Sequence, residues 1–277
     1  MKLNNMDLDL ITNIAIEAAL SAGRIILKYK NRNYKVLNKE GGSSYASQVL
    51  TEVDILCQNE ILDIISPCIK EFHLGLLTEE LEDNCSRFEK EYFFSVDPMD
   101  GTKSFIESDH GFSVSISLVE KNGVPVIGVV YDPIKNNLYY GIKGHGLFKN
   151  RVKWIPKFRV VDTNLKVLVD PSFVKISTDN IEYLEYGGAV LNGIEVLEGR
   201  ADCYLKLPKK DNGGGSIWDF SSITLFYNEC NAIAQNMFNN PIFLNSPDTT
   251  FMNTQGVIFC KDDEVKNKIF STLKLSF

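Results

Sequence analysis

The stretch VDPMDGTKSF, from Val96 to Phe105, follows an aromatic run, YFFS, that is typical of a buried strand. It places two acids, Asp97 and Asp100, at the edge of a core, where burial and mutual repulsion both disfavour ionisation. The proline between them fixes its own φ and helps to hold both acids toward a common point. The Gly-Thr pair that follows offers backbone N–H groups at a predicted helix start, where an anion such as phosphate binds. A bound cation is therefore predicted beside the two acids.

The whole chain has an ordinary globular composition with an excess of acid. It has 277 residues, of which 44% are hydrophobic and 23% charged, and its net charge is -7. This length allows one large domain or two smaller ones. The acidic balance argues against nucleic acid as a partner and suits a protein that binds cations. The first residues, MKLNNMDLDL, lack the features of a signal peptide, and no apolar run approaches membrane-spanning length. We therefore expect a cytoplasmic protein with no membrane partner.

Cysteine and histidine are too scattered to indicate a metal site of their own. No C-x-x-C pair occurs, so neither a zinc site nor a disulfide framework is predicted. We expect reduced cysteines that act as small apolar residues. The residues concerned are Cys57, Cys68, Cys85, Cys203, Cys230 and Cys260, with His73, His110 and His145.

The first part of the chain reads as two amphipathic helices. Apolar residues spaced by three and four predict a helix over residues 7–30, capped by Asp7. Thr51 with Asp54 three residues later resembles a capping box, which predicts a second helix that stops near Pro67. The acid of such a box is free to bind backbone N–H groups.

Strands dominate the sequence between residues 72 and 155. Their most definite turn is Asn122-Gly123, a strong hairpin signal. Before them, the polar segment 31–48 is predicted to be a loop with at most short strands.

The last part of the chain alternates strands with helices. Helices are predicted over residues 189–198, ended by Gly199, then from Asp219, and finally from about Asp262. We interpret residues 1–155 as an N-terminal α+β subdomain that carries most metal ligands, and residues 156–277 as a C-terminal α/β subdomain.

Acids gather at the ends of these predicted elements. Carboxylates that converge there form the hard oxygen cage that Mg²⁺ prefers, and metal ions beside a phosphate cradle indicate phosphoryl chemistry. Taken singly, several acids have a structural explanation: Asp219 as a helix N-cap, Asp54 as a capping residue, and Glu80 with Glu82 as a solvated turn. The acids of DPMDGT after an apolar strand have no comparable explanation.

Six segments between about residues 51 and 256 carry a family resemblance: LTEVD, LLTEE, VDPMDGTKSF, GVVYDP, GGAVLNGIEVLEGRADCY and IWDFSS. In these segments the sequence resembles the inositol monophosphatase superfamily. These lithium-sensitive, magnesium-dependent phosphatases include the 3'(2'),5'-bisphosphate nucleotidases and a class of histidinol-phosphate phosphatases. The resemblance implies a fold that combines α+β and α/β parts. It is the layered α-β-α-β-α sandwich of the inositol monophosphatase and fructose-1,6-bisphosphatase type.

The resemblance also implies the metal ligands. Glu79, Asp97 and the backbone carbonyl of Met99 match the ligands of a first Mg²⁺, and Asp97, Asp100 and Asp219 match those of a second. Glu79 would also reach a weaker third ion. Two or three Mg²⁺ ions are thus implied, and Li⁺ is expected to inhibit.

Catalytic and substrate-binding roles follow from the same match. Asp54 and Thr102 match the pair that orients and deprotonates the attacking water, and Glu79 joins them as a catalytic residue. The implied substrate-binding residues are Gly101, Thr102, Lys103, Asp100 and Asp219.

Two departures from the family pattern remove none of these residues. Thr78-Glu79-Glu80 stands where the family often has Gly-Glu-Glu, and Asn231-Ala232 stands where a Gly-Gly pair is usual. Asparagine tolerates the left-handed conformation, so Asn231 is expected to end the helix that starts near Asp219.

The expected function is a Mg²⁺-dependent phosphomonoesterase. Its substrate would be a small-molecule phosphate ester, inositol monophosphate or 3'-phosphoadenosine 5'-phosphate, hydrolysed by in-line attack of metal-activated water. Lys103 and the lysines Lys206, Lys209 and Lys210 favour a substrate with a second phosphate, although lysines beside a flexible loop are usually solvated. The alternatives are a histidinol-phosphate phosphatase, which DGTKSFI also resembles, and a catalytically silent metal-dependent regulatory or binding protein. A homodimer is a further possibility.

Overall fold

The computed structural model describes residues 2–38, 49–161, 164–170, 173, 175, 176, 178, 180–213 and 215–275. Most of the predicted loop 31–48 lies outside these residues. Its described part contains one short strand, β1 (Val36–Asn38), within the prediction of at most short strands; β1 pairs antiparallel with β2 (Val49–Thr51), which begins just after the predicted loop.

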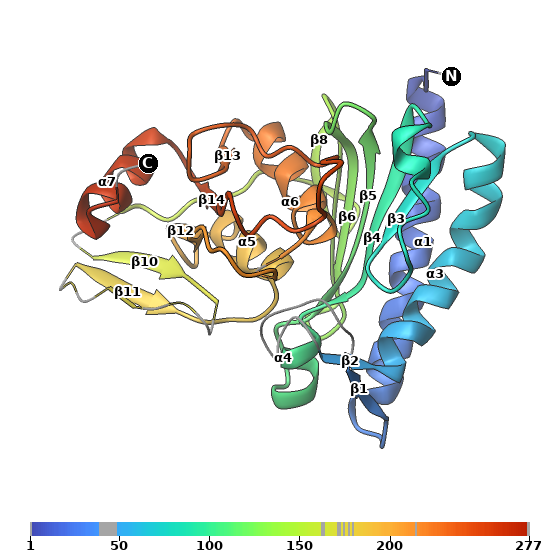
Figure 1. Ribbon diagram of the computed structural model, residues 1–277, viewed down its shortest axis with the longest axis horizontal. Helices are drawn as coiled ribbons and strands as arrows, with labels where there is room; N and C mark the ends of the chain where they lie inside the picture. The colour runs from blue at the N-terminus through green and yellow to red at the C-terminus, as the bar shows by residue number, and fades with distance from the viewer. Residues whose placement is uncertain are drawn as a thin grey trace.

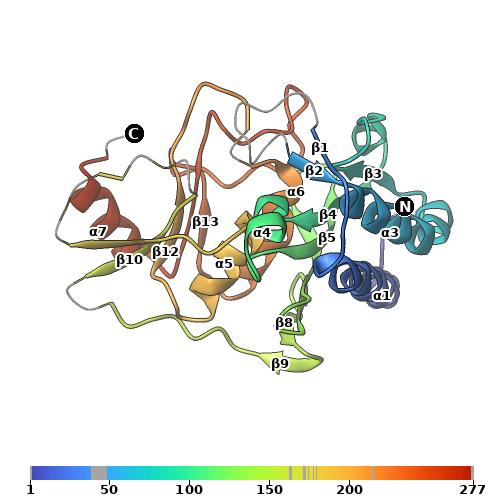
Figure 2. The same cartoon turned by 90° about the horizontal axis from the view of Figure 1, so that it is seen from below.

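Helices and sheets alternate in layers along the longest axis of the molecule (Figure 1). Helices α1 (Asn5–Lys30) and α3 (Glu52–Glu71) cover the outer face of a seven-stranded sheet. Helices α5 (Ala189–Leu197) and α6 (Ile217–Glu229) separate this sheet from a five-stranded one, and α7 (Asp263–Leu273) covers the far face. The perpendicular view in Figure 2 keeps the same order of layers. The predicted α-β-α-β-α sandwich is confirmed.

The first sheet runs in chain order from β3 to β9. Its first two strands are parallel and the others antiparallel. Gly123, with φ 82°, makes the predicted hairpin turn. The strands are β3 (Gly75–Thr78), β4 (Tyr92–Asp100), β5 (Ser113–Glu120), β6 (Pro125–Asp132), β7 (Asn137–Ile142), β8 (Gly146–Lys149) and β9 (Val152–Trp154).

The second sheet has the order β11-β10-β12-β14-β13. From β10 the chain moves to β11 on one side and then returns to β12 on the other, and both pair parallel with β10. The strands are β10 (Leu165–Leu168), β11 (Ile181–Leu184), β12 (Cys203–Lys206), β13 (Ile233–Gln235) and β14 (Val257–Cys260).

Two predicted boundaries of the outer helices are wrong. Asn4, not Asp7, caps α1: the Asn4 side chain accepts from the backbone of Met6, and the Asp7 carboxylate accepts from Asn4 N at 2.9 Å. Helix α3 continues past Pro67 to Glu71. We attribute this to packing, because Cys68, on the next turn, is buried in the core.

Helix α1 is more apolar than the sequence analysis allowed. By length and composition it would suffice to cross a membrane, so the expectation that no apolar run approaches that length is wrong. Its apolar side chains, such as Ile11 and Ile26, belong to the core beneath the first sheet. In the protein, 56% of the apolar window is buried.

The inner helices match their predictions closely. Helix α5 ends just before Gly199, which has φ 73°. Helix α6 starts two residues before Asp219, after Ser216, because Asp219 occupies its first turn instead of the cap. Asn231, with φ 55°, takes the left-handed conformation that ends α6, as predicted.

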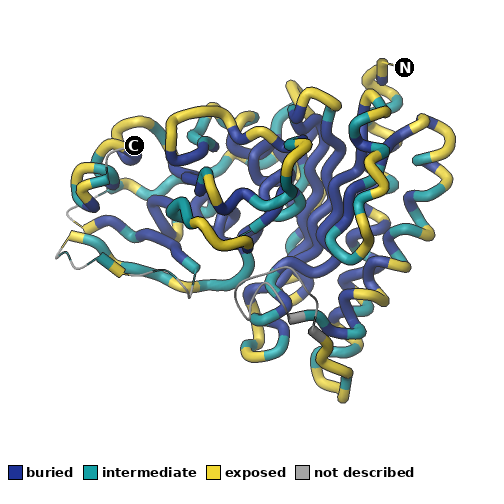
Figure 3. Tube along the Cα trace, in the orientation of Figure 1, coloured by how far each residue is buried: buried dark blue, intermediate teal, exposed yellow. Residues whose placement is uncertain are grey.

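Helix α6 shares one hydrophobic core with both sheets. Strands of the first sheet are buried along most of their length (Figure 3). Small residues let α6 approach them: Ser222 Oγ lies 2.9 Å from the hydroxyls of both Ser115 and Ser117, and a Cβ on Gly128 would lie 3.0 Å from the Phe226 ring. Helix α6 is therefore held closely against the first sheet.

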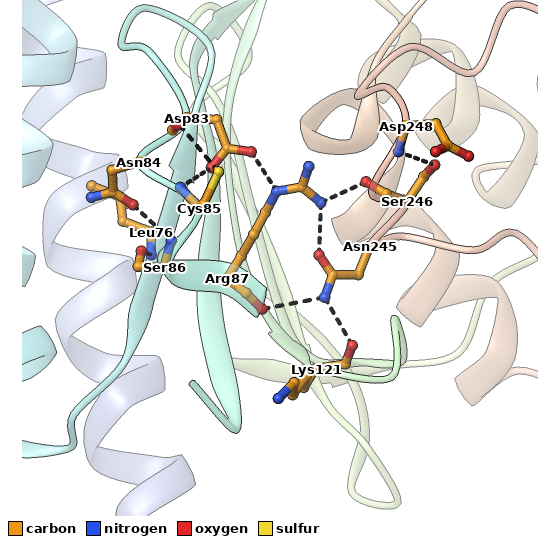
Figure 4. A network of polar contacts seen from close by, with 10 residues as sticks. All are labelled: Leu76, Asp83, Asn84, Cys85, Ser86, Arg87, Lys121, Asn245, Ser246 and Asp248. Carbon is orange, nitrogen blue, oxygen red and sulfur yellow. Dashed lines mark hydrogen bonds and ion pairs between the residues drawn. The ribbon is translucent and has the colours of Figure 1, made fainter. Parts of the chain in front are cut away.

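A buried arginine joins the first sheet to the C-terminal part of the chain. Arg87, in the short 3-10 helix Ser86–Phe88, donates to Asp83 Oδ2 and Asn245 Oδ1 at 2.7 Å each and to Ser246 O at 2.9 Å (Figure 4). Asn245 in turn donates to Lys121 O at 2.8 Å. We call Asp83, Arg87, Asn245 and Ser246 the Arg87 clasp.

The six cysteines are free thiols. Cys57, Cys68, Cys203 and Cys260 are buried, as expected of small apolar residues, whereas Cys230 is half-buried and Cys85 is exposed.

Candidate active site

Two parallel strands bring the first acids together. In the register of β3 and β4, Thr78 lies opposite Val96, and Glu79 N donates to Val96 O at 3.2 Å. Glu79 and Asp97 therefore follow paired residues at the same edge of the sheet. The register with β5 shifts between Asp97 and Asp100, which gives β4 an irregular end there.

Helix α6 supplies the third acid. Carboxylate oxygens of Asp97, Asp100 and Asp219 lie within 4.8 Å of one another, and we call these three residues the acid cluster. The Ser221 hydroxyl donates to Ser95 Oγ at 3.2 Å, two residues from Asp219 on one side and two from Asp97 on the other. This buried contact fixes the start of α6 against the end of β4.

Burial and mutual repulsion act strongly on the acid cluster. Burial, followed by the charges of Glu79, Asp100 and Asp219, raises the pKa of Asp97 well above its ordinary value. Asp97 is 1% exposed; its Oδ1 accepts from Met99 N at 3.0 Å. Its Oδ2 is buried and has no hydrogen-bond partner in the described part of the chain. The pKa of Asp100 is also raised, by burial and by Asp219.

The acid cluster fits a divalent cation such as Mg²⁺. Hard carboxylate oxygens are the ligands Mg²⁺ prefers, and the buried Asp97 Oδ2 is an acceptor that a cation would satisfy. Asp97, Asp100 and Asp219 would hold one ion, and Glu79, whose charge acts on Asp97, lies at the same edge. The Met99 carbonyl, named as a ligand by the resemblance, accepts from Thr102 Oγ1 at 3.2 Å.

Asp54 and Thr102, 48 residues apart, form a buried pair. Thr102 Oγ1 donates to Asp54 Oδ1 at 2.8 Å, while Asp54 Oδ2 accepts from the backbone and hydroxyl of Thr51 at 2.7 and 2.6 Å. The predicted capping box is confirmed. Burial raises the pKa of Asp54 to about 6 despite these hydrogen bonds. The carboxylate thus caps α3 with one oxygen and faces Thr102 with the other.

Glycines shape the backbone beside the acid cluster. Gly101 has φ 88° before α4 (Thr102–Glu107), and a Cβ there would lie 2.4 Å from Gly111 O. A Cβ on Gly188 would lie 2.2 Å from Asp100 Oδ2. Asp100 therefore sits directly on the start of α5, where its carboxylate accepts from the backbone N–H groups of residues 189 and 190 at 3.0 and 2.9 Å.

Lys103 points along its own helix. Its ammonium lies 3.7 Å from Glu107, one turn further along α4. The structure thus brings together Asp54 with Thr102 and the three acids of the cluster, with Glu79 beside them, and ties Lys103 to the helix surface.

The sequence analysis missed Gln58. Its Oε1 accepts from Thr78 Oγ1 at 2.5 Å and from Glu80 N at 3.1 Å, on both sides of Glu79. Thr78 stands where the family often has glycine, and its hydroxyl makes a hydrogen bond to Gln58 that glycine could not make. The signal was present, because Gln58 follows Asp54 by four residues and so lies on the same face of α3.

A family model described as the inositol monophosphatase family matches residues 7–272. The chain belongs to this family. Among its relatives, Nus factor SuhB of Haemophilus influenzae is 28% identical over 80% of this chain and 90% of its own. The 3'(2'),5'-bisphosphate nucleotidase CysQ of the same organism is 26% identical over 86% and 89%. The crystal structure of extragenic suppressor protein suhB from Bartonella henselae superposes with a TM-score of 0.76. That match has 21% identity and covers 97% of this chain and 100% of the other.

Membership of the inositol monophosphatase family identifies the chain as a phosphatase of this superfamily in general terms. Magnesium dependence is typical of the family, and the acid cluster is compatible with it. The expected fold and the suspected family are both confirmed.

Proposed function

We propose that this chain is a Mg²⁺-dependent phosphomonoesterase of small metabolites, with inositol monophosphate or 3'-phosphoadenosine 5'-phosphate as the substrate. The observation that carries the proposal is the acid cluster, with its buried and unpartnered Asp97 Oδ2 in the described part of the chain. A cytoplasmic location agrees with an α1 whose apolar side chains lie in the core.

Asp97, Asp100 and Asp219 would hold one Mg²⁺, and Glu79 with the Met99 carbonyl would complete a second site around Asp97. When bound, Mg²⁺ supplies positive charge that polarises the phosphate ester and lowers the pKa of the attacking water. The protein's part is to hold these oxygens at the ends of β3, β4 and α6, so that little reorganisation is needed when substrate arrives.

Thr102 and Asp54 would handle the proton of the attacking water. The Thr102 hydroxyl donates to Asp54 Oδ1 and lies beside the Met99 carbonyl, and its lone pairs remain acceptors. It can accept a proton there while it passes its own to Asp54. The raised pKa of Asp54, about 6, makes this carboxylate a better proton acceptor than an ordinary aspartate.

The start of helix α4 would orient the phosphate, because free N–H groups at a helix start favour an anion. Gly101, which precedes α4, lacks a side chain where one would collide with neighbouring atoms. At the start of α5 the N–H groups of residues 189 and 190 already bind Asp100. Lys103, paired with Glu107, would act on the substrate through its charge alone.

Phosphate release from a panel of esters, with Mg²⁺ and with excess chelator, tests the proposal. Activity should vanish with chelator and return when Mg²⁺ is restored. Full activity in excess chelator would refute the metal-dependent reading. Li⁺ should inhibit, with Na⁺ as the matched salt control.

A second candidate is a regulatory or binding protein that keeps the fold without turnover. One relative carries the name Nus factor, which favours this alternative. No release of phosphate from any ester with Mg²⁺ present would support it. Histidinol phosphate belongs in the panel as the remaining alternative substrate.

A further inference from the structure

A lysine at the end of α1 holds the far end of the helix that carries Thr102. Lys30 is the last residue of α1, and its ammonium donates to Phe105 O at 2.7 Å and to Ser108 O. Phe105 lies in α4, and Ser108 caps the C-terminus of that helix. A cation on the last carbonyls of a helix is favourable, because these groups lack partners within the helix and carry partial negative charge.

The surroundings of Lys30 keep its ammonium in place. Its side chain is 12% exposed. The ammonium lies 5.3 Å and 5.4 Å from the ring centroids of Phe105 and Phe112, two buried rings that pack edge to face. Aromatic faces attract such a cation. The carboxylate of Asp109, 3.9 Å away, is fully exposed, and an ion pair with such a group contributes little. Lys30 is thus held mainly by α4 and by the two rings.

Helix α4 is too short to keep its position unaided. It spans six residues, and isolated helices shorter than about 12 residues are marginal in water. Its own ion pair, between Lys103 and Glu107, joins two residues of the helix surface. The direction of α4 therefore depends on its contacts with other elements.

Those contacts come from one pair of helices. At the first residue of α4, Thr102 donates to Asp54 of α3, and at the other end Lys30 of α1 binds the carbonyls. The two long helices are themselves joined, because the Ser21 hydroxyl of α1 donates to Glu60 of α3. The end of α1 and the start of α3 lie at the same end of the molecule as α4 (Figure 1). Both ends of α4 are therefore fixed to a common support.

We propose that Lys30 is a positioning residue: it fixes the C-terminal end of α4 so that the Thr102 hydroxyl stays on Asp54 Oδ1. The inference rests on the proposed phosphatase function, in which this pair handles the proton of the attacking water. Thr102 lies three residues before Phe105, less than one helical turn, so a tilt of α4 there would displace the hydroxyl. A displacement of about 1 Å at a reacting group can cost about 100-fold in rate.

Phosphate release with Mg²⁺, expressed per folded molecule, tests the inference. In Lys30→Met, kcat should fall about tenfold, because α4 is no longer held. KM should stay within about threefold, because Gly101, just before α4, is packed against Gly111 O independently of Lys30. Lys30→Arg keeps donors for both carbonyls and should restore kcat to within about threefold of wild type. Lys28→Met, an exposed change on the same helix, should leave kcat unchanged. An unchanged kcat in Lys30→Met would overturn the inference.

A double variant separates positioning from stabilisation alone. A residue that only stabilises the fold lowers the melting temperature and leaves the kcat of the folded enzyme near normal. In the Thr102→Ala background no hydroxyl remains to be positioned, so adding Lys30→Met should lower kcat by less than about twofold further. Its effect on the melting temperature should persist there. Losses in kcat that multiply would show that Lys30 acts by another route and would overturn the inference.

Hydrogen exchange on the metal-free protein gives a readout that needs no turnover. Amides of residues 102–108 should exchange at least about fivefold faster in Lys30→Met and near the wild-type rate in Lys30→Arg, whereas those in the middle of α3 should not change. Equal exchange of residues 102–108 in wild type and Lys30→Met would contradict the proposed tether. A wild-type protein that hydrolyses no ester, p-nitrophenyl phosphate included, would instead refute the proposed function itself.

Discussion

The Arg87 clasp and the acid cluster both bury charged side chains, but they satisfy them differently. Arg87 is 2% exposed and donates to three oxygens of Asp83, Asn245 and Ser246. Asp97 is 1% exposed and lies among carboxylates; its Oδ2 accepts no hydrogen bond from any described residue. The clasp supplies the partners of its charge from the protein, whereas the acid cluster leaves an acceptor to something outside the chain.

This difference separates stability from function. A buried charge with good partners resists removal, because its loss leaves those partners unsatisfied. A buried group of like charges destabilises the metal-free protein and gains its compensation only when a cation binds. Substitutions in the clasp should therefore act on folding, and substitutions in the acid cluster on catalysis, with opposite effects on metal-free stability.

The largest effect is expected for Asp97→Asn. The rate should fall by at least about two orders of magnitude, on the scale of losing a major electrostatic contributor. The metal-free protein should become more stable by about 1 kcal/mol, because one repelling charge is gone. Rate assays and urea unfolding in chelator measure the two quantities. The same change in the clasp, Asp83→Asn, should lower stability and leave kcat near normal. An Asp97→Asn rate within a few-fold of wild type would contradict the assignment.

Thr102→Ala and Asp54→Asn should each lower kcat by about 100-fold with little change in KM, since general acid–base groups contribute on this scale. If they act as one unit, the double variant should be scarcely worse than the poorer single one. Thr102→Ser keeps the hydroxyl and serves as the control. An Asp54 that only caps α3 predicts instead about 1 kcal/mol of lost stability and near-normal turnover. Multiplicative losses in the double variant would rule out a shared proton.

Arg87→Leu should destabilise the protein by about 3 kcal/mol, as for other buried charged partners removed singly. Activity per folded molecule should stay near wild type, because the clasp shares no residue with the acid cluster. Thermal melting and rate assays below the transition separate the two. Arg87→Lys, which retains the positive charge, is the control. A loss below about 1 kcal/mol would show that the clasp contributes little.

The smallest effect concerns pH. Burial and repulsion raise the pKa of Asp97 and of Asp100 above 3.8, the ordinary value of an aspartate. The folded protein then binds protons that the unfolded chain has released, so metal-free stability should rise as the pH falls from about 8 to about 5. Saturating Mg²⁺ should flatten or reverse this trend, because it competes with the protons. A metal-free protein whose stability falls as the pH falls over this range would contradict the prediction.

Sequence position together with the family resemblance predicted the acid cluster. Asp97 and Asp100 follow an apolar strand, so the end of that strand places both without knowledge of packing; Asp219, which taken singly reads as a helix cap, was joined to them by the family resemblance. The same reasoning found the capping box of Thr51 and Asp54. It gave the layered fold through the family resemblance.

Long-range partners were beyond this reasoning. Arg87 and Asn245 are 158 residues apart, and neither lies in a periodic segment that would predict contact. Local propensity predicts a helix end at Pro67, because it says nothing of the core that holds Cys68. The placement of β11 and β12 on opposite sides of β10 also depends on strand order, which the sequence pattern does not predict.

Helix α6 has a consequence for how the molecule comes apart. One hydrophobic cluster contains Val130 and Tyr139 of the first sheet, Phe226 of α6, and Tyr204 and Phe259 of the second. Separating either sheet from α6 would expose apolar side chains of this shared cluster. The sheets therefore share one cooperative unit, and we expect calorimetry to record a single unfolding transition in which the calorimetric and van't Hoff enthalpies agree.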